Sequence, residues 1–197
     1  MAPGPEALEA LRQAWSQVQS LGDEPTITAA ANPAAQPMSA DDPAAAAREI
    51  ALRRLSVRAR SRKELASDLK SREVAPEIAE QVLDRFTEVG LIDDGAFAQE
   101  WVESRGRRSG TAKLRQELRL KGVSEEHIAE ATGGRADEDL DNARALATRK
   151  AASMRGLDSL VRQRRLNAFL GRRGFSNAVI RRVIAEVLDA EPEPGED

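Results

Sequence analysis

Few side chains in this sequence are of the kinds that enzymes use for catalysis. The chain has one histidine, His127, and no cysteine, so a cysteine nucleophile and a zinc site built from Cys and His are both excluded. His127 occupies a position that Ile78 and Val179 hold elsewhere in a repeated apolar pattern. This equivalence favours a partly buried structural role for the imidazole over a catalytic one.

Two further segments have compositions that can bind ions or phosphates in other proteins. The acidic run DEDLD at 137–141 lacks the spacing and the glycine of a calcium loop, whereas carboxylates in the first turn of a helix complement its dipole. The segment GRRSGTAK at 106–113 has neither a preceding strand nor the spacing of a Walker loop. We therefore predict a protein that is not an enzyme and that uses no cofactor and no metal ion.

Basic side chains, in contrast, gather in three clusters, each at or near the start of the middle helix of a predicted three-helix repeat. Charges on a merely solvated surface would be scattered, so this recurrence predicts a shared binding surface. Arg outnumbers Lys by 25 to 5. One explanation is a GC-rich genome, and the other is that guanidinium groups suit phosphates and carboxylates. The predicted partner- or nucleic-acid-binding residues are Arg58, Arg60, Arg62 and Lys63 in the first cluster; Arg105, Arg107, Arg108, Lys113, Arg115 and Lys121 in the second; and Arg162, Arg164, Arg165, Arg172 and Arg173 in the third, which Arg181 and Arg182 extend.

The elements that must position these clusters follow from a repeated apolar spacing. Three residues that are four and then five apart occur three times, and this helical periodicity at a period of roughly 50 residues is typical of helical arrays. We predict an all-α fold, a tandem array of three three-helix repeats that is elongated or crescent-shaped. The three sets are Leu65, Leu69 and Val74; Leu114, Leu118 and Val123; and Leu166, Leu170 and Phe175.

Capping residues indicate where the helices begin. Ser61 and Glu64 form a predicted capping box, and Pro76 suits the first turn of the next helix. Asp93 and Ser124 are suitable N-caps for two later helices. The predicted repeats cover residues 45–92, 93–134 and 135–189.

Apolar residues also indicate where helices run. The first helix of the first repeat is expected to run through Ile50, Leu52, Leu55 and Val57, and a helix of the third repeat to include Leu160. The four phenylalanines are expected in the core: Phe86, Phe97, Phe169 and Phe175.

Both ends of the chain differ in charge from the repeats. Residues 1–47 have a net charge of −5 and residues 48–188 of +7, and five acidic residues from Asp189 onward bring the total to −3. Residues 1–44 are predicted to be a largely disordered extension with a short helix over 6–21 and an Ala/Pro-rich linker, and residues 190–197 a disordered acidic tail. No apolar run approaches the ~20 residues of a membrane span, and the N-terminus lacks the layout of a signal peptide. We therefore expect a cytoplasmic monomer that contacts no membrane.

Two binding functions remain open on these grounds. A helix-turn-helix protein that acts on DNA directly would place the last helix of a repeat in the major groove. That helix begins with Glu77 and Glu80 in the first repeat and with Glu125 and Glu126 in the second, and phosphates repel carboxylates. Trp101 is the only tryptophan within the repeats, so there is no aromatic platform for single strands. A basic module that binds another protein, including one already on DNA, fits the residues better.

Three stretches, in this order, resemble the bacterial RecX regulatory proteins: GLIDDGAFAQEWVESR, SGTAKLRQELRLKGVSEEHI and RLNAFLGRRGFSNAVIRRVI. The resemblance covers about residues 45–188 and leaves the first 44 outside it. It implies three-helix repeats that bind the RecA nucleoprotein filament, with DNA bound weakly or within that filament. It further implies that the protein modulates, and mostly inhibits, the ATPase, strand-exchange and co-protease activities of RecA in recombination, DNA repair and the SOS response. The resemblance supplies no catalytic residues and no cofactor.

Overall fold

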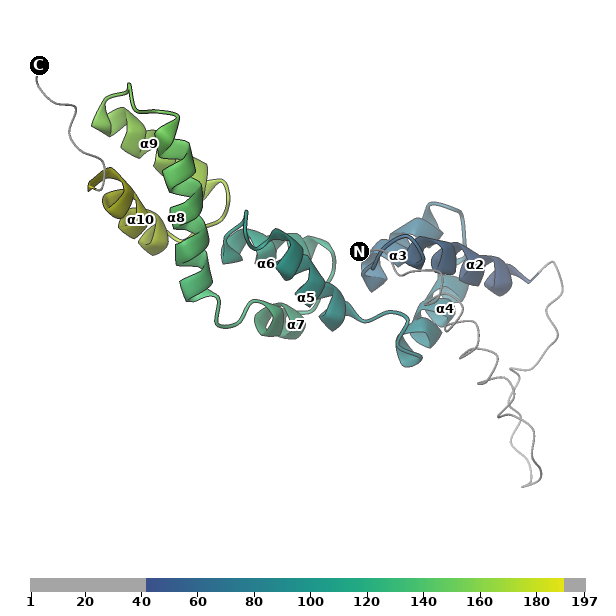
Figure 1. Cartoon of the computed structure of the whole chain (residues 1–197). Coiled ribbons are helices and arrows are strands. Elements are labelled where there is room, and N and C mark those ends of the chain that lie inside the picture. The colour runs from purple at the N-terminus through teal and green to yellow at the C-terminus, as the bar shows by residue number, and fades with distance from the viewer. Residues whose placement is uncertain (1–41, 190–197) are drawn as a thin grey trace, which may run out of the picture. The chain divides into compact units, whose positions relative to one another are not determined.

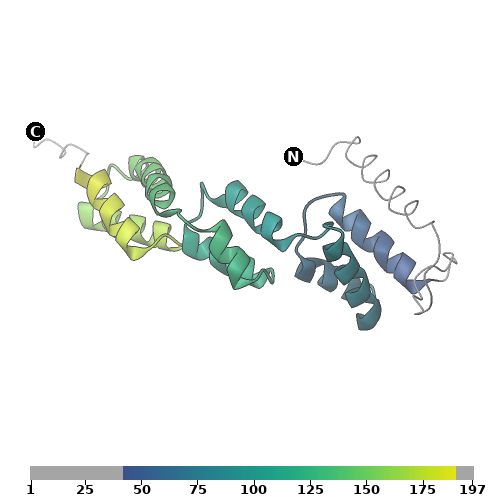
Figure 2. The same ribbon diagram turned by 90° about the horizontal axis from the view of Figure 1, so that it is seen from below.

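All regular elements of the described residues, 42–189 of the computed structural model, are α-helices (Figures 1 and 2). Nine helices, α2 to α10, lie in this range, and it contains no strand. The described residues form two compact units, which divide between Ile92 and Asp93. The helix predicted over 6–21 and the tail predicted over 190–197 lie outside the described residues.

Unit 1 contains three helices, α2 (Pro43–Leu55), α3 (Arg62–Lys70) and α4 (Pro76–Glu88). The expected capping box begins α3, since the hydroxyl of Ser61 accepts from the N–H of Glu64 and the Glu64 carboxylate accepts from the N–H of Ser61. Apolar side chains from all three helices meet in one core, where a fully buried leucine contributes about 1.5–3 kcal/mol. The buried residues of this core are Ala47, Ala51, Leu65, Leu69, Ala79, Val82, Leu83, Phe86 and Ile92.

Unit 2 contains two successive three-helix groups. The first comprises α5 (Asp94–Arg105), α6 (Thr111–Leu120) and α7 (Glu125–Ala131). The second comprises α8 (Ala136–Ala152), α9 (Ser159–Gly171) and α10 (Asn177–Asp189). Each group has its own apolar cluster. The first cluster includes Phe97, Leu114, Leu118 and Ile128, and the second includes Ala147, Leu166, Leu170, Phe175 and Val183.

A turn of one shape follows the middle helix of every group. Residues with positive φ end these helices: Glu73 (φ 61°), Gly122 (φ 81°) and Gly174 (φ 79°). The two glycines adopt the left-handed region without penalty, whereas a non-glycine residue in this conformation costs roughly 1–2 kcal/mol. The shared turn supports the repeat that the apolar spacing predicted, and it identifies Glu73 as a site of local strain.

The predicted all-α tandem array of three-helix repeats is therefore confirmed. Leu65, Leu69, Leu114, Leu118, Leu166 and Leu170 are all fully buried. Three of the phenylalanines are buried as expected, and Phe169 is half-buried against the core of the second group of unit 2.

Leu52 and Leu160 lie in helices as predicted but are exposed, whereas Val57 lies beyond the end of its predicted helix. Val57 is 67% exposed because α2 ends at Leu55, and Leu52 is 48% exposed because Ala51, one residue earlier, faces the core. Leu160 is 74% exposed because it lies in the first turn of α9, ahead of the buried stripe that begins at Leu166. Small alanines, which carry little apolar signal, take the core positions of α2.

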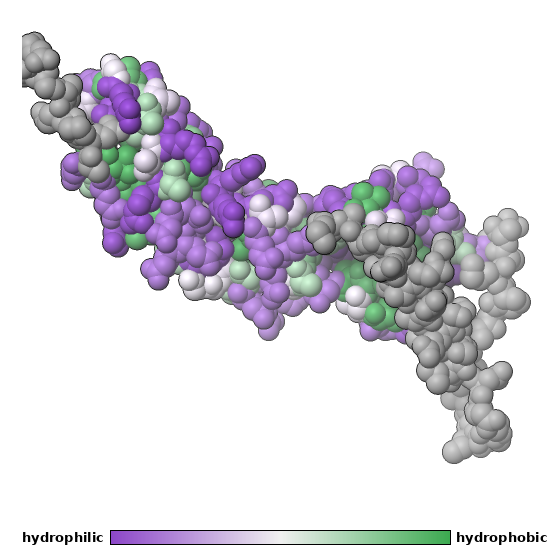
Figure 3. Space-filling model, viewed as in Figure 1, coloured by the Kyte–Doolittle hydropathy of each residue, from purple (hydrophilic) through white to green (hydrophobic). Residues whose placement is uncertain are grey.

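The space-filling view shows a mainly hydrophilic surface with small apolar patches (Figure 3). No helix within residues 42–189 combines the length and the apolar character needed to cross a bilayer.

Candidate partner-binding surfaces

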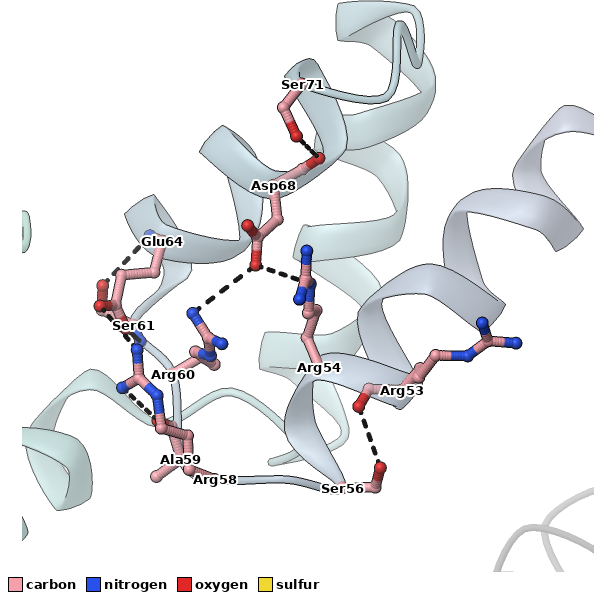
Figure 4. Close-up of polar contacts among 10 residues, drawn as sticks. All are labelled: Arg53, Arg54, Ser56, Arg58, Ala59, Arg60, Ser61, Glu64, Asp68 and Ser71. Atoms are coloured by element: carbon pink, nitrogen blue, oxygen red, sulfur yellow. Dashed lines mark hydrogen bonds and ion pairs between the residues drawn. The ribbon is translucent and has the colours of Figure 1, made fainter.

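The first basic cluster is largely neutralised by carboxylates of unit 1. Arg54 and Arg60 approach the same Oδ2 of Asp68, at 3.2 and 3.7 Å, and Figure 4 shows the two guanidinium groups converging on it. Arg58 pairs with Glu64 at 3.3 Å. The cations of this cluster are therefore committed to holding α2, α3 and the intervening loop together.

Arg62 and Lys63 complete the first cluster, and they differ in whether a carboxylate lies near the charged group. Arg62 pairs across to α4, where it contacts Glu80 and lies 2.8 Å from Asp84. Desolvation opposes the charged guanidinium, but the hydrogen bonds that it donates to these two carboxylates outweigh this effect and raise the pKa of Arg62. Lys63 is exposed, and within residues 42–189 no carboxylate lies within 4 Å of it.

The second cluster is organised around Glu117 on α6. The indole N–H of Trp101 donates to Glu117 Oε2 at 3.0 Å, and Arg105 and Lys113 both lie 3.9 Å from its carboxylate oxygens. The Cζ of Arg105 is 3.4 Å from the centroid of the Trp101 ring, and the Nζ of Lys121 is 4.2 Å from it. Cation–π contacts of this kind hold basic side chains in place. Two of the predicted residues, Arg105 and Lys121, thus contact one half-buried tryptophan, and Lys113 lies near its carboxylate partner Glu117.

A carboxylate at one repeat position explains why both clusters are neutralised. Asp68 lies one residue before the buried Leu69, and Glu117 lies one residue before the buried Leu118. The third group has Phe169 at this position, where the guanidinium of Arg173 lies 3.8 Å from the ring centroid. The third cluster consequently lacks the anion that the first two contain.

The loop between α5 and α6 exposes two arginine side chains, although the residues on both sides of them are buried. Gly106, Ser109 and Gly110 are buried, whereas Arg107 and Arg108 are exposed. Across the described part of the chain, no carboxylate lies within 4 Å of either guanidinium. These two predicted residues therefore remain available to a partner.

Two glycines allow this loop to pack against the third group. The N–H of Gly110 donates to the Arg173 carbonyl at 2.8 Å, and the N–H of Ala112 donates to the Gly174 carbonyl at 3.3 Å. A Cβ on Gly110 would lie 2.4 Å from the Gly174 oxygen, and a Cβ on Gly174 would lie 2.4 Å from Lys113 Cβ. The two backbones thus touch where any side chain would collide.

Asp139 caps α6 from a different three-helix group. Its carboxylate accepts from the N–H of Thr111 at 3.0 Å, and it is 6% exposed. Arg135 lies 4.0 Å from the other carboxylate oxygen. The acidic run does lie in the first turn of α8 as expected, but nothing in the sequence signalled that one member reaches α6.

Beside this contact lies an open cleft of about 380 Å³. Arg115 in its wall donates to Thr132 Oγ1 at 2.8 Å, and Arg119 donates to Glu125 at 2.9 Å. The hydrogen bond from Arg119 lowers the pKa of Glu125. Both guanidinium groups are thus engaged within unit 2. The cleft is lined by Thr111, Ala112, Arg115, Arg119, Asp139, Gly174 and Ser176.

The third cluster contains the most available positive charge. Arg164, Arg165 and Arg172 are exposed, as is Arg181 on α10, and no carboxylate of residues 42–189 lies within 4 Å of them. Arg162 is half-buried. Among the described residues, no three His, Cys, Asp or Glu side chains gather as a metal site would require.

Family models match all three helical groups. The first three-helix domain of RecX matches residues 47–86, the second matches 93–131 and the third matches 137–184. The regulatory protein RecX of Streptomyces coelicolor is 46% identical over 158 residues, which are 79% of this chain and 84% of that protein. The one from Thermobifida fusca is 42% identical over 154 residues, covering 77% and 83%.

Solved structures agree with these sequence matches. The crystal structure of RecX from Lactobacillus salivarius aligns with a TM-score of 0.67 over 74% of this chain and 97% of that one, and at 22% identity it supports the fold alone. A second crystal structure, of a regulatory protein RecX, also aligns with a TM-score of 0.67, at 28% identity over 72% of this chain and 73% of that one. From its three matched domains and these relatives, the chain belongs to the RecX family of regulatory proteins.

Proposed function

We propose that this protein binds the RecA nucleoprotein filament and modulates, mostly by inhibition, its ATPase, strand-exchange and co-protease activities. It would act as a monomer in the cytoplasm, in recombination, DNA repair and the SOS response. Membership of the RecX family is the observation that carries this proposal. The arrangement of three-helix groups with outward-facing arginines is consistent with a partner rich in phosphates and carboxylates.

Arg107 and Arg108 are the residues we propose for the most important contact. Their loop is fixed at both ends by buried backbone, at Gly106 and Gly110, so little backbone entropy would be lost on binding. Arg164, Arg165 and Arg172 would form a second contact, and Lys63 would form a separate one in unit 1. The remaining predicted residues already have partners within the protein, and we assign them a smaller share of binding.

The test is the ATPase of RecA on single-stranded DNA with this protein at substoichiometric ratios. Reversal of Arg107 and Arg108 to Glu should weaken inhibition clearly while helical content stays unchanged. Lys70→Glu with Arg72→Glu is a matched control, because both residues are exposed, lie outside the predicted set and change the net charge equally. Full inhibition by the Arg107/Arg108 variant would show that these charges are only solvated.

Direct action on DNA is a second candidate for the third group. Carboxylates occupy the first turns of α4 and α7, but the first turn of α10 has none and Arg181 and Arg182 follow it. Fluorescence anisotropy of free DNA at several salt concentrations separates the two functions. If phosphates are the main partner, each lost contact lowers the salt slope by about 0.7–0.9. If carboxylates of RecA are the main partner, charge reversal reduces the inhibition of RecA but hardly changes binding to free DNA.

A further inference from the structure

An unusually one-sided stretch of charge lies in α9, the following turn and α10. Residues 159–185 include seven arginines and no acidic residue. Four of them, Arg164, Arg165, Arg172 and Arg181, are exposed without a carboxylate of the described residues within 4 Å. We call these four the free-arginine group. In the other two helical groups, Asp68 and Glu117 pair with several of the nearby cations, and the third helical group has no such carboxylate at the equivalent position.

Helix geometry places Arg165 of α9 and Arg172, the C-cap residue that directly follows α9, on one side. Arg165 and Arg172 are seven residues apart, close to two full turns, and Val161 lies one turn before Arg165. Val161 is 40% exposed. The surface therefore combines guanidinium groups with an accessible apolar edge.

The sequence continues from the end of α10 with an opposite charge. Residues 190–197, AEPEPGED, contain four carboxylates and no basic residue. Eight extended residues span at most about 26–29 Å. Arg181 precedes the last residue of α10, Asp189, by roughly 12 Å of helix. The tail is therefore long enough to return along α10 to Arg181 and onward to the turn that contains Arg172.

Covalent attachment makes such a contact effective although each ion pair is weak. One exposed ion pair changes an equilibrium constant by no more than about fivefold. A short tether, however, supplies an effective concentration in the millimolar range, and the four carboxylates of the tail equal in number the four guanidinium groups. A polyanionic partner that offers more charges can still displace the tail.

We propose that residues 190–197 bind the free-arginine group and compete there with anionic partners of the protein. The other acidic segment, residues 1–41, is a weaker candidate. It contains Arg12, and along the sequence it is far from the free-arginine group, whereas residues 190–197 directly follow α10. The tail would act as an intramolecular competitor whose effect decreases as salt rises, because the Debye length falls to about 3 Å at 1 M.

The direct test exploits the absence of cysteine from the sequence. A spin label on Gly195→Cys in the full chain should broaden the NMR amide signals of Arg164, Arg165 and Arg172 at low salt. The broadening should disappear at high salt. It should also disappear in a neutral-tail control, with Glu191, Glu193 and Glu196 changed to Gln and Asp197 to Asn. Broadening confined to the last turn of α10, or equal broadening in the control, would overturn the proposal.

A second measurement tests competition with a labelled heparin as the polyanion. The neutral-tail variant should bind about three- to tenfold more tightly than the unmodified chain at low salt, and the two should converge at high salt. Equal affinities at low salt contradict the proposal. If removal of residues 1–41 increases the affinity and tail neutralisation does not, the N-terminal segment is the occupant and the proposal is wrong. Neither measurement contains RecA, so the result is independent of the proposed function.

Discussion

The close approach of the backbones at Gly110 and Gly174 makes any added side chain destabilising. The free-energy cost has two components, backbone strain and steric overlap, which different substitutions can separate. Gly174 has φ 79°, so alanine there adds left-handed strain of about 1–2 kcal/mol. Its Cβ would also lie 2.4 Å from Lys113 Cβ, where ordinary contacts are about 3.5–4 Å, and overpacking of this kind costs about 1–3 kcal/mol. We expect Gly174→Ala to lower the free energy of unfolding of unit 2 by about 2–5 kcal/mol.

Two control variants in unit 2 isolate the components. Gly134 has φ 69° and open space where a Cβ would stand, so Gly134→Ala should cost only the strain of about 1–2 kcal/mol. Gly110 has φ −74°, which alanine adopts freely, so Gly110→Ala should cost only the steric term of about 1–3 kcal/mol. The cost at Gly174 should approach the sum of the two.

The assay is urea unfolding followed by the fluorescence of Trp101, which lies in unit 2 beside Glu117. Because the chain has one other tryptophan, Trp15, the measurements use a Trp15→Phe background. Equal losses for Gly174→Ala and Gly134→Ala would refute the close approach, because backbone strain alone would then account for both. An unchanged midpoint for Gly110→Ala would refute it independently.

Two further expectations concern single carboxylates. Glu73→Gly should raise the free energy of unfolding of unit 1 by about 0.5–1 kcal/mol, since Glu73 is exposed at φ 61° and glycine removes strain at some entropic cost; an unchanged or lower melting temperature would contradict this. Hydrogen bonds from Arg144 and then Arg182 hold the pKa of Glu186 below its ordinary value of 4.5, so its contribution to stability is present above that value and is lost as pH falls through the lower folded pKa. Glu186→Gln should therefore destabilise unit 2 near pH 7 and make its stability less sensitive to pH below 4.5, and parallel pH profiles for the two proteins would contradict the assignment.

Local features of the fold could be predicted from the sequence because their causes are local. The capping box at Ser61, the N-caps at Asp93 and Ser124 and the buried leucines of each middle helix depend on residues a few positions apart. Helical periodicity records such neighbours directly. Val57 was misplaced because apolar character alone does not show where a helix ends.

Contacts between distant residues could not be predicted in the same way. Asp139 reaches Thr111 from another helical group, and the neutralisation of Arg60 and Arg105 depends on carboxylates whose direction only packing determines. The sequence did show where basic residues recur. It did not show which of them remain unpaired, and that distinction is what separates Arg107 and Arg108 from most of the other predicted residues.

The division between Ile92 and Asp93 has a consequence for synthesis on the ribosome. The core of unit 1 draws only on residues before Asp93, so its helices can pack while the rest of the chain is still being made. The loop at Gly110, in contrast, obtains its hydrogen-bond acceptor only when Arg173 has been added and has left the exit tunnel. Until then the N–H of Gly110 lacks this acceptor. The nascent chain can therefore acquire its order from the N-terminal side, and the contact at Gly110 forms only after most of the chain has been made.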